Sequence, residues 1–525
     1  MQNSSIESRV AAFIDIGTNS IRMLLVRINP NRSFTVLSDQ KETVRLGEGE
    51  FADGYLQPQA MERAIQVCRQ FAEMARASGA DPIHAVATSA TRDAHNQDEF
   101  IRRLKHEANL DVRVISGREE ARLIYLGIVN SIHLQDRTAL MIDIGGGSTE
   151  VILGSAREYH FLDSLKLGAI RLTTTFFLPD EPAPVKPARY ALLQQFVRNA
   201  SVRARQSLAA LPFDLAYGSS GTIENLADIA IQMDFKRRRT RDDVLTLDQV
   251  SRVVQLLCAL PLQERRRIPG INPARADIII GGAAILHTLM QDLNIPQICI
   301  SEHGLRDGLL IDFLAQGEHA DLVSGSSVRE RSVLQLARAC NFDEAHARKT
   351  ADLALQLFDS AAESGLLRPN PQTRELLEYA ALLHDIGAFL SYSNHQAHTY
   401  YLVRNTELLG FNQTEIAIIA NIGLFHRKAL PKKRKHPQYA ALDKTSRKTV
   451  RTLAVLLRIA ESLDRSHTGV VQCVRLRFDK NTQTACLHIC ARENEAQLEL
   501  WGVQNHTKAF QKVFKHPLKI TREEP

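Results

Sequence analysis

The sequence predicts an α/β protein with two similar lobes that face each other, followed by a helical domain and a small α+β domain. The same Asp-Ile-Gly-x-x-Ser signature occurs twice, in FIDIGTNSIRMLLV at residues 13–26 and in MIDIGGGSTEVILG at residues 141–154. Turns rich in glycine, serine and threonine follow buried strands in both halves. From about residue 325 the apolar pattern becomes helical, which predicts the further domains.

Length and composition agree with this division. A chain of 525 residues is too long for one hydrophobic core. Its hydrophobic content of 44% and charged content of 24% are ordinary for a soluble globular protein and argue against disorder. The longest apolar stretch, IIIGGAAILHTLM, is shorter than the roughly 20 residues of a membrane span, and the N-terminus lacks a signal-peptide pattern. We therefore expect a cytoplasmic protein with no membrane partner.

Cysteine spacing and charge add two further expectations. Seven cysteines are scattered without a CxxC pair, which predicts small buried apolar residues in a reducing compartment. The formal net charge is only +6, but basic residues gather in FKRRRT, ERRRIPG and HRKALPKKRKH. Such runs are usually solvated surface, and otherwise they attract a polyanion.

Each signature opens a β-meander. In the first copy, strands AAFID and IRMLLVRI flank the turn IGTNS and precede strand SFTVLSDQ. In the second copy, strands ALMID and TEVILG flank the turn IGGGS and precede strand YHFLDSLKLG. A glycine turn between two alternating apolar runs is typical of a hairpin. The two halves are therefore expected to share one topology.

After each meander the pattern changes to helices and further strands. Buried strands are expected in IHAVATSATRD and in LAYGSSGTIENLADIAI, and a last strand and turn in ADIIIGGAAILHTLM. Ligands of such sheets bind where loops converge between the lobes. The expected domains are the two lobes at 1–125 and 126–312, the helical domain at 313–465 and the α+β domain at 466–525.

The two glycine turns suit phosphate oxygens. Glycine lets the backbone approach a ligand closely, and successive N–H groups form a concavity for anions. This is not a Walker P-loop, because Gly-Lys-Ser/Thr is absent and the turn leads into a strand. One such turn is equally well a tight hairpin with a surface aspartate, but duplication favours phosphate binding. The expected phosphate cradle comprises Gly17, Thr18, Asn19, Ser20, Gly145, Gly146, Gly147, Ser148 and Gly221.

The two-lobed repeat resembles the superfamily of actin, sugar kinases and heat-shock chaperone ATPases, whose paired hairpins hold a phosphate chain and a divalent cation. More closely, FIDIGTNSIRMLL, AVATSATRDA, VISGREEARLIYLG, IDIGGGSTEVI and LKLGAIRLT resemble, in this order, the exopolyphosphatase and guanosine pentaphosphate phosphatase family. The resemblance implies actin-like (ribonuclease H-like) lobes and hydrolysis of inorganic polyphosphate or guanosine pentaphosphate. It also implies a homodimer, and no specific nucleic-acid partner is expected.

Phosphoanhydride hydrolysis needs an oriented water, a base for its proton and positive charge on the phosphate oxygens. Glu119 and Glu120 are neighbours on a predicted helix, so they project roughly 100° apart and only one can face a cleft. The resemblance implies that Glu120 is the general base. It also implies that Arg92 contacts phosphate, as a guanidinium fork does well.

The metal-side residues also come from the resemblance. It implies that Asp143 and Glu150 hold Mg²⁺ or another divalent cation, which needs only one or two carboxylates because it keeps several waters. Asp15, the equivalent of Asp143 in the first lobe, is expected to bind metal through water or to fix its own loop.

Three functions remain in competition with polyphosphate hydrolysis. Removal of the 5′ terminal phosphate of guanosine pentaphosphate is the alternative within the family, and the sequence does not separate the two. A kinase of the same superfamily is suggested by IIIGGAAIL, which lies where such kinases contact adenosine, but Glu120 beside the cradle favours water as the acceptor. A polyphosphate- or nucleic-acid-binding protein without turnover is suggested only by the basic runs.

The helical region resembles the HD metal-dependent phosphohydrolase superfamily. Neutral imidazoles bind transition metals readily. Two interpretations stay open: a scaffold with residual ligands, which is favoured because related exopolyphosphatases often carry a non-catalytic HD-like domain, and a working second metal site. The nearby run RKALPKKRK would then bind a long anionic chain in a salt-sensitive way. The expected ligands are His346, His384, Asp385 and Asp464, with His395, His398 and His426 as further candidates.

Overall fold

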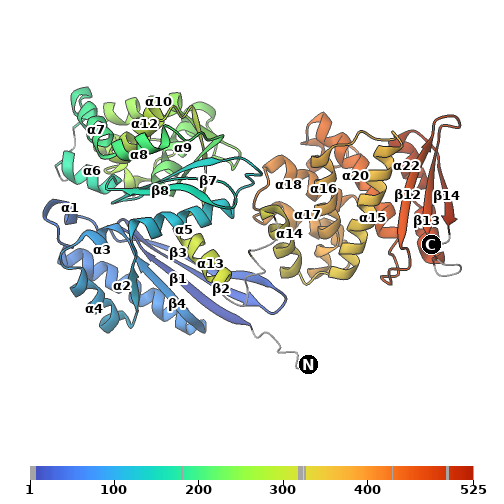
Figure 1. Ribbon diagram of the computed structural model, residues 1–525, viewed down its shortest axis with the longest axis horizontal. Helices are drawn as coiled ribbons and strands as arrows, with labels where there is room; N and C mark the ends of the chain where they lie inside the picture. The colour runs from blue at the N-terminus through green and yellow to red at the C-terminus, as the bar shows by residue number, and fades with distance from the viewer. Residues whose placement is uncertain are drawn as a thin grey trace. The chain divides into compact units, whose positions relative to one another are not determined.

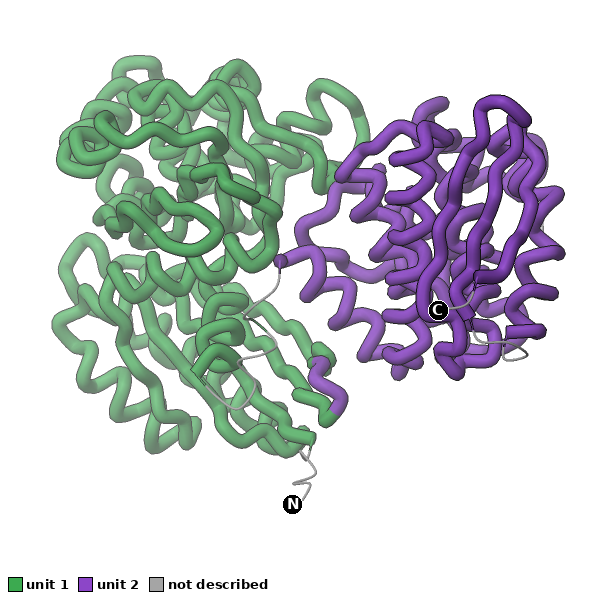
Figure 2. Tube along the Cα trace, turned by 45° about the vertical axis from the view of Figure 1, so that its right-hand side comes forward, with its two compact units in different colours: residues 1–30, 34–325 green, residues 31–33, 326–525 purple. Residues whose placement is uncertain are grey.

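The computed structural model describes residues 8–178, 181, 183–316, 323, 327–427, 430–491 and 496–523. The chain forms two compact units, one up to residue 325 and one from residue 326, with residues 31–33 grouped with the second (Figure 2). The boundary expected at residue 312 falls inside helix α13 (Leu305–Gln316). Among the described residues, no helix is long and apolar enough to span a membrane.

Lobe I has a five-stranded sheet in the order β3-β2-β1-β4-β5 (Figure 1). Strands β1 and β2 are antiparallel, and β4 and β5 join β1 in parallel. Helices α2 and α4 cover one face around Ile14, Ile65 and Phe100, whereas α5 and α13 cover the other around Phe13 and Leu123. The elements are β1 (Arg9–Ile16), β2 (Ser20–Asn29), β3 (Ser33–Thr43), α1 (Glu50–Asp53), α2 (Pro58–Ala77), β4 (Ala80–Ala87), α3 (Ser89–Asp93), α4 (Gln97–Ala108), β5 (Val112–Val114) and α5 (Gly117–Val129).

Lobe II repeats this topology in a six-stranded sheet, because the order β8-β7-β6-β9-β11 corresponds to β3-β2-β1-β4-β5, with β10 added at the edge. The sequence prediction of duplicated α/β lobes is therefore confirmed. The elements are β6 (Ala139–Ile144), β7 (Thr149–Gly154), β8 (Tyr159–Leu165), α6 (Ala169–Phe176), α7 (Pro187–Ala200), α8 (Val202–Leu208), β9 (Leu215–Ser219), α9 (Ser220–Phe235), β10 (Val244–Thr246), α10 (Leu247–Ala259), α11 (Leu262–Arg265), η1 (Pro273–Arg275), α12 (Ile279–Asp292) and β11 (Gln297–Ile300).

Two strand predictions were too long. In LAYGSSGTIENLADIAI only Leu215–Ser219 is a strand, and helix α9 begins directly at Ser220. The buried positions Ile223, Leu226 and Ala230 follow helical spacing, which the short apolar run concealed. Likewise IHAVATSATRD leaves the strand after Ala87 and enters helix α3.

The expected strand and turn in ADIIIGGAAILHTLM are wrong, because α12 starts at Ile279 and contains both glycines. A Cβ on Gly281 would lie 2.8 Å from the carbonyl oxygen of Ala169, and one on Gly282 would lie 2.3 Å from Cγ2 of Thr222. The glycines therefore let α12 pack closely against α6 and α9. They form no adenosine-contacting turn, which removes the main observation for the kinase alternative.

The second unit joins the helical region and the C-terminal sheet around one hydrophobic core. Its three-stranded sheet has the order β12-β13-β14, and β12 packs on α15. The run QLELWG lies in helix α21. The elements are α14 (Val328–Ala339), α15 (Glu344–Glu363), α16 (Pro371–Leu383), η3 (Ile386–Phe389), α17 (His395–Asn405), α18 (Gln413–Leu424), α19 (Pro437–Ala440), α20 (Lys444–Ser462), β12 (Cys473–Asp479), β13 (Thr484–Cys490), α21 (Gln497–Gln504), α22 (Thr507–Phe514) and β14 (Leu518–Glu523).

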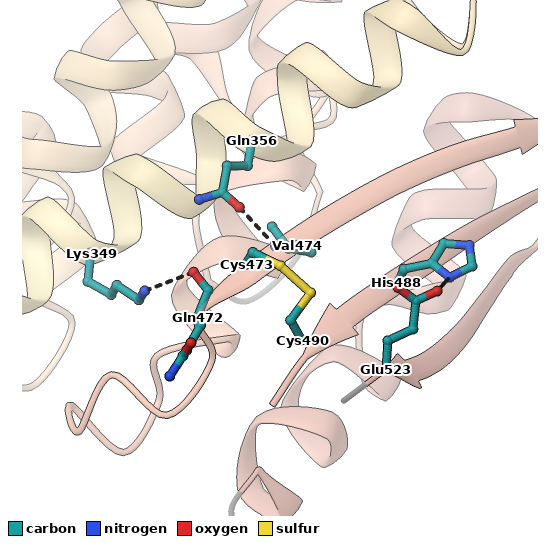
Figure 3. The surroundings of a disulfide bond; sticks show 8 residues. All are labelled: Lys349, Gln356, Gln472, Cys473, Val474, His488, Cys490 and Glu523. Carbon is teal, nitrogen blue, oxygen red and sulfur yellow. Dashed lines mark hydrogen bonds and ion pairs between the residues drawn. A yellow bond between two sulfur atoms is a disulfide. The ribbon is translucent and has the colours of Figure 1, made fainter. Parts of the chain in front are cut away.

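A disulfide joins Cys473 of β12 to Cys490 of β13 (Figure 3). The two cysteines are direct partners in the antiparallel register, with their Cα atoms 5.1 Å apart. The neighbouring Val474 N–H donates to Oε1 of Gln356 on α15 at 2.8 Å. The expectation that all cysteines are unpaired is therefore wrong for this pair, because strand register rather than sequence spacing brought the two together. The other five cysteines are free.

Candidate active site

The two signature turns are closed in the same way. The N–H of Gly17 donates to the carbonyl oxygen of Ser20 at 3.1 Å, and the N–H of Gly145 donates to that of Ser148 at 3.0 Å. A Cβ on either glycine would lie close to that same carbonyl oxygen, at 2.9 Å for Gly17 and 3.2 Å for Gly145. Local geometry thus explains the first glycine of each turn.

The remaining glycines of the second turn have a tertiary reason. A Cβ on Gly146 would lie 3.0 Å from Thr18 of the first turn, and a Cβ on Gly147 would lie 2.9 Å from Oγ1 of Thr18 and 2.6 Å from Oγ of Ser89. Side chains at these positions would therefore push the two hairpins apart. Contact between the lobes requires Gly146 and Gly147.

Between the hairpins lies a cavity of about 110 Å³, here called the cleft. Among the described residues, those that line the cleft do not include Arg92, Glu150 or Gly221. Each nevertheless lies next to a lining residue: Arg92 next to Glu120, Glu150 next to Asp143 and Gly221 next to Arg275. The expected residues that line it are Asp15, Gly17, Thr18, Asn19, Ser20, Glu120, Asp143, Gly145, Gly146, Gly147 and Ser148.

Helix α5 gives its two adjacent glutamates different surroundings. Ser116 caps the helix by accepting the N–H of Glu119 at 3.2 Å, which fixes the first turn. Glu119 points away from the cleft to Arg122, and the hydrogen bonds from Arg122 hold the pKa of Glu119 below its usual range. Glu120 lines the cleft, and burial raises its pKa to about 7 against the opposing effect of Arg92. Of the two glutamates, Glu120 is therefore the one that combines access to the cleft with a pKa near neutrality.

Arg92 lies behind Glu120 at the wall of the cleft. Its Nη1 donates to Oε2 of Glu120 at 2.9 Å and to the carbonyl oxygen of Ile115 at 2.9 Å. This pair orients the carboxylate of Glu120.

Three buried carboxyl groups, of Asp15, Glu120 and Asp143, line the cleft, and that of Glu150 lies beside Asp143 on the neighbouring strand. Burial raises the pKa of Asp15 to about 6 and that of Asp143 to about 6. Burial, with Glu120 and Asp143 nearby, raises the pKa of Glu150 well above its usual value. So many desolvated acids are costly unless a cation accompanies them.

The donor set fits a hard divalent cation. Oδ1 of Asp15 is buried and has no hydrogen-bond partner among the described residues. Asp143 and Glu150 are direct partners across β6 and β7, and each accepts a serine hydroxyl, from Ser219 at 2.5 Å and from Ser164 at 2.7 Å. Carboxylate oxygens held in this way are the ligands that Mg²⁺ prefers.

The sequence analysis missed the basic residues of the cleft. Arg22, Arg275 and Arg306 line it together with the acids Glu224 and Glu302. Arg22 faces Asp15 across the ladder, and its alternation with Ser20 on one strand face was a usable signal. Arg275 covers Gly221, where a Cβ would lie 2.5 Å from Nη2. Nothing in the sequence pattern linked Arg275 or Arg306 to the hairpins.

A second missed group comes from the segment SEHGLRD at residues 301–307. Asp307 accepts the N–H of Gly304 at 3.0 Å and pairs with Nδ1 of His303 at 3.1 Å. The Cα of Gly304 passes so close to the cleft that its Cβ would lie 3.7 Å from Oδ2 of Asp143. Clustering of His, Gly and Asp before a helix was the available signal.

In the second unit, four histidines share one orientation. Each ring uses Nδ1 for a hydrogen bond to a fixed acceptor: His346 to Oδ2 of Asp464 at 2.8 Å, His384 to the carbonyl of Ala381 at 2.7 Å, His395 to that of Tyr392 at 3.0 Å and His426 to that of Gly423 at 2.5 Å. Carbonyl and carboxylate oxygens can only accept, so Nδ1 carries the proton and Nε2 of each neutral ring carries a lone pair.

These lone pairs converge on Asp385. Its Oδ1 lies 3.1 Å from Nε2 of His395 and 3.3 Å from Nε2 of His426, and the two Nε2 atoms are 3.3 Å apart. Nε2 of His384 lies 3.6 Å from Oδ2 of Asp385 and has no hydrogen-bond partner among the described residues. Converging lone pairs repel each other unless protons or a metal ion lie between them. Two ligand groups result, His346–His384–Asp385 and Asp385–His395–His426.

Two expected residues have other places. Asp464 accepts hydrogen bonds from Nδ1 of His346 and, at 3.0 Å, from the N–H of Gly469. It therefore positions the imidazole ring of His346. His398 belongs to neither ligand group. Within the basic run, residues 428 and 429 lie outside the described residues.

The first unit thus combines actin-like lobes with a cleft of hydroxyls, arginines and buried carboxylates, and this combination defines a hydrolase of phosphoric anhydrides. The Ppx/GppA phosphatase family matches residues 24–316, and domain III of the same family matches residues 328–506. The chain therefore belongs to the Ppx/GppA phosphatase family.

Individual relatives agree with this assignment. The chain is 29% identical over 481 residues, which is 91% of this chain and 92% of the relative, to the guanosine-5'-triphosphate,3'-diphosphate pyrophosphatase of Aeromonas salmonicida. The crystal structure of an exopolyphosphatase from Cytophaga hutchinsonii matches with a TM-score of 0.55 and 28% identity, covering 59% of this chain and 99% of that one. An exopolyphosphatase-like protein matches with a TM-score of 0.53 and 28% identity, covering 58% of this chain and 98% of that one.

Proposed function

We propose that the first unit is an exopolyphosphatase, which hydrolyses the terminal phosphate of inorganic polyphosphate. The observation that carries the choice of substrate is the lining of the cleft. It contains Arg22, Arg275 and Arg306 but no phenylalanine, tyrosine or tryptophan among the described residues. Such a lining suits successive phosphates, and it offers none of the larger aromatic rings on which a guanine base would stack.

In this proposal Glu120 takes the proton of the attacking water, because it is the buried acid with a pKa of about 7 at the cleft. The N–H groups and hydroxyls of the two hairpins hold the terminal phosphate, and Arg92 fixes the carboxylate of Glu120. A divalent cation held by Asp143, with Glu150 and Asp15 beside it, would neutralise charge on the phosphate oxygens. The arginines orient the rest of the chain.

Initial rates on polyphosphate and on guanosine pentaphosphate, with Mg²⁺ and no second acceptor, test the proposal. We expect a higher kcat/KM on polyphosphate. The alternative is a guanosine pentaphosphate 5′-phosphohydrolase, which the name of the Aeromonas relative favours, and a preference for the nucleotide would establish it. Dependence of turnover on a second acceptor would instead support a kinase. A protein that binds polyphosphate without releasing phosphate would contradict all three.

We further propose that the second unit holds a transition metal between its histidines and Asp385. The convergent Nε2 lone pairs support this, because four neutral imidazoles and one carboxylate suit Zn²⁺, Mn²⁺ or Fe²⁺ better than Mg²⁺. Metal content of the purified chain, measured by mass spectrometry, tests it. We expect His395→Ala to lower the bound metal and His398→Ala, three residues along the same helix, to leave it unchanged. Equal metal in all three proteins would overturn the proposal.

The homodimer stays a prediction from the family resemblance, and the cytoplasmic location stays a prediction from the N-terminal sequence and the apolar and cysteine patterns. Sedimentation velocity of the full chain tests the first. Quantifying free thiols in protein alkylated at the moment of cell lysis tests the second, since the disulfide between Cys473 and Cys490 runs against a reducing compartment.

A further inference from the structure

Lobe I contains a second cavity, of about 760 Å³, here called the rear cavity. The cavity exists because strand β5 is shorter than its neighbour β4. β5 has only three residues, which pair with Ala85–Ala87 of β4, because the chain then turns and Ser116 caps α5. The first half of β4, up to His84, therefore has no strand on its outer side. Helices α4, α5 and α13 enclose the space that a longer β5 would have filled.

The rear cavity is separate from the cleft, since no described residue lines both. The two cavities nevertheless share helix α5. Glu119 and Arg122 line the rear cavity, whereas Glu120 and Ile124 line the cleft. Helices α5 and α13 pack against each other over the sheet (Figure 1). A ligand between them would act on the helix that carries Glu120.

One wall of the rear cavity is aromatic and apolar. Phe313 of α13 is half-buried and lies 5.0 Å, ring centre to ring centre, from His84. His84 in turn stacks on Phe13 with parallel rings 5.5 Å apart. Ile101 and Leu309 complete this wall. Such a surface accepts a flat ring.

His84 adds one polar group to that wall. Its Nε2 has no hydrogen-bond partner among the described residues. Burial, together with Arg113 and Arg9, lowers the pKa of His84, so the ring is neutral and offers one uncharged hydrogen bond. A buried polar atom without a partner is uncommon in proteins and is a mark of a missing ligand or water.

Of the cations in the rear cavity, Arg113 is the least neutralised. Arg122 is held by Glu119 and Asp312, and Lys105 pairs with Asp111. Arg113 is 63% exposed, and its nearest acid is Glu119 at 3.7 Å, which already accepts two hydrogen bonds from Arg122. Its guanidinium fork remains available to an anion.

We propose that the rear cavity binds an organic anion with one planar ring: the ring lies against the wall formed by Phe313 and His84, and its anionic group binds Arg113. The volume is within the range of small-molecule sites, roughly 300–1,000 Å³. Nucleoside monophosphates and aromatic carboxylates share this chemistry, and the experiment separates them. Occupancy changes phosphatase turnover through α5, and this last step rests on the proposed function.

Calorimetric titration of the full chain with the substitution Glu120→Gln, which leaves ligands unhydrolysed, tests binding without using activity. The titrants are guanosine and adenosine monophosphates, 4-hydroxybenzoate and inorganic phosphate. We expect a ring-bearing titrant to bind with one site, and Arg113→Leu to weaken it at least about tenfold, as the loss of a charge-assisted pair does. Arg27→Leu, an exposed arginine on β2 of the same lobe, is the matched control. Ile101→Trp, which fills the cavity, should weaken binding without removing charge.

Three results would overturn the proposal: no ring-bearing titrant binds, inorganic phosphate binds as tightly as they do, or Arg22→Leu in the cleft abolishes binding while Arg113→Leu does not. With binding established, the wild-type rate on polyphosphate is measured with and without the ligand. We expect at least a twofold change in kcat/KM that Arg113→Leu removes. An inactive chain that still binds would refute the proposed function alone, and an active chain that does not bind would refute the rear site alone.

Discussion

The two candidate sites of this chain gather buried acceptor atoms in opposite ways. The cleft of the first unit collects four carboxyl groups with hydroxyls and arginines, whereas the second unit collects four imidazoles around Asp385. In both places the acceptors face each other and need positive charge between them. In the proposal made above, this difference in donor chemistry would select the cation, because carboxylates suit Mg²⁺ and imidazoles suit transition metals. The cleft also brings arginines for a polyanion, which the histidine cluster lacks in its ligand groups.

The largest expected effect concerns the two adjacent glutamates of α5. Glu120→Gln should lower kcat on polyphosphate by about 10²–10⁴-fold, because a glutamine cannot take the proton of water. Glu119→Gln should change kcat less than about threefold, since Glu119 is paired with Arg122 outside the cleft. Steady-state phosphate release measures both. Similar losses in the two variants would show that the helix, not the base, had been damaged.

Cation selectivity tests the comparison directly. Asp143→Asn should lower turnover about 100-fold or more and raise the Mg²⁺ concentration needed for half-maximal rate. His426→Ala should leave that Mg²⁺ dependence unchanged and remove transition metal from the second unit. The readouts are Mg²⁺ titrations of the rate and metal analysis of each variant. If His426→Ala shifted the Mg²⁺ titration, the two sites would not be independent.

The disulfide gives the second unit a covalent constraint that the described residues of the first unit lack. Reduction, or Cys473→Ser, should lower the free energy of unfolding of the second unit by about 3 kcal/mol, the value for a loop near 15 residues. Figure 3 shows the strand ends that it holds beside Gln356 of α15. Denaturant unfolding with and without reductant measures the change, and Cys486→Ser, on the same strand, is the control. An unchanged transition would exclude a stabilising role.

In the second hairpin, Gly145 is required by the local geometry of the turn, whereas Gly147 is required by contacts with lobe I. Gly147→Ala should cost about 1–3 kcal/mol and lower turnover, because its Cβ would meet Ser89 and Thr18 of lobe I. Gly145→Ala should cost less, since its Cβ would meet only the carbonyl of Ser148 at 3.2 Å. Thermal unfolding and polyphosphate rates of both variants check this. The reverse order would mean that the lobes do not touch through Gly147 in solution.

The smallest expected effect concerns a buried acid outside both sites. Glu50 is 2% exposed, and burial raises its pKa to about 8 against the opposing effect of Arg171. Its folded-state pKa lies above the unfolded value, so the folded protein binds more protons between about pH 4.5 and 8 and its stability falls as the pH rises. Glu50→Gln should reduce that fall, which we expect to be on the order of 1 kcal/mol. Thermal unfolding from pH 5 to 8 measures it. If stability depended on pH equally in both proteins, Glu50 would be in contact with water rather than buried.

Much of the cleft was predictable from sequence, because repeated patterns report local geometry. The hairpins were found from two copies of one signature. Helix spacing showed that only one of Glu119 and Glu120 can face the cleft, and the family resemblance pointed to Glu120. Arg275 and Arg306 were not predictable, since they reach the cleft from distant segments that carry no periodic signal. The strand expected before Gly281 failed for a related reason: a short β-branched run between glycines fits a strand and a buried helix equally well.

The amino-acid sequence by itself determined the duplicated lobes, the paired glycine turns, the family and the histidine-rich second unit, because strand alternation, turn chemistry and motif order are local properties of the chain. Only the tertiary structure decided which acids meet in the cleft, that His384, His395 and His426 present Nε2 to Asp385, that Cys473 pairs with Cys490 and that a short β5 leaves the rear cavity open. Each of these depends on strand register or on packing between distant segments. Pairwise distances of that kind are fixed by the whole core rather than by any stretch of sequence.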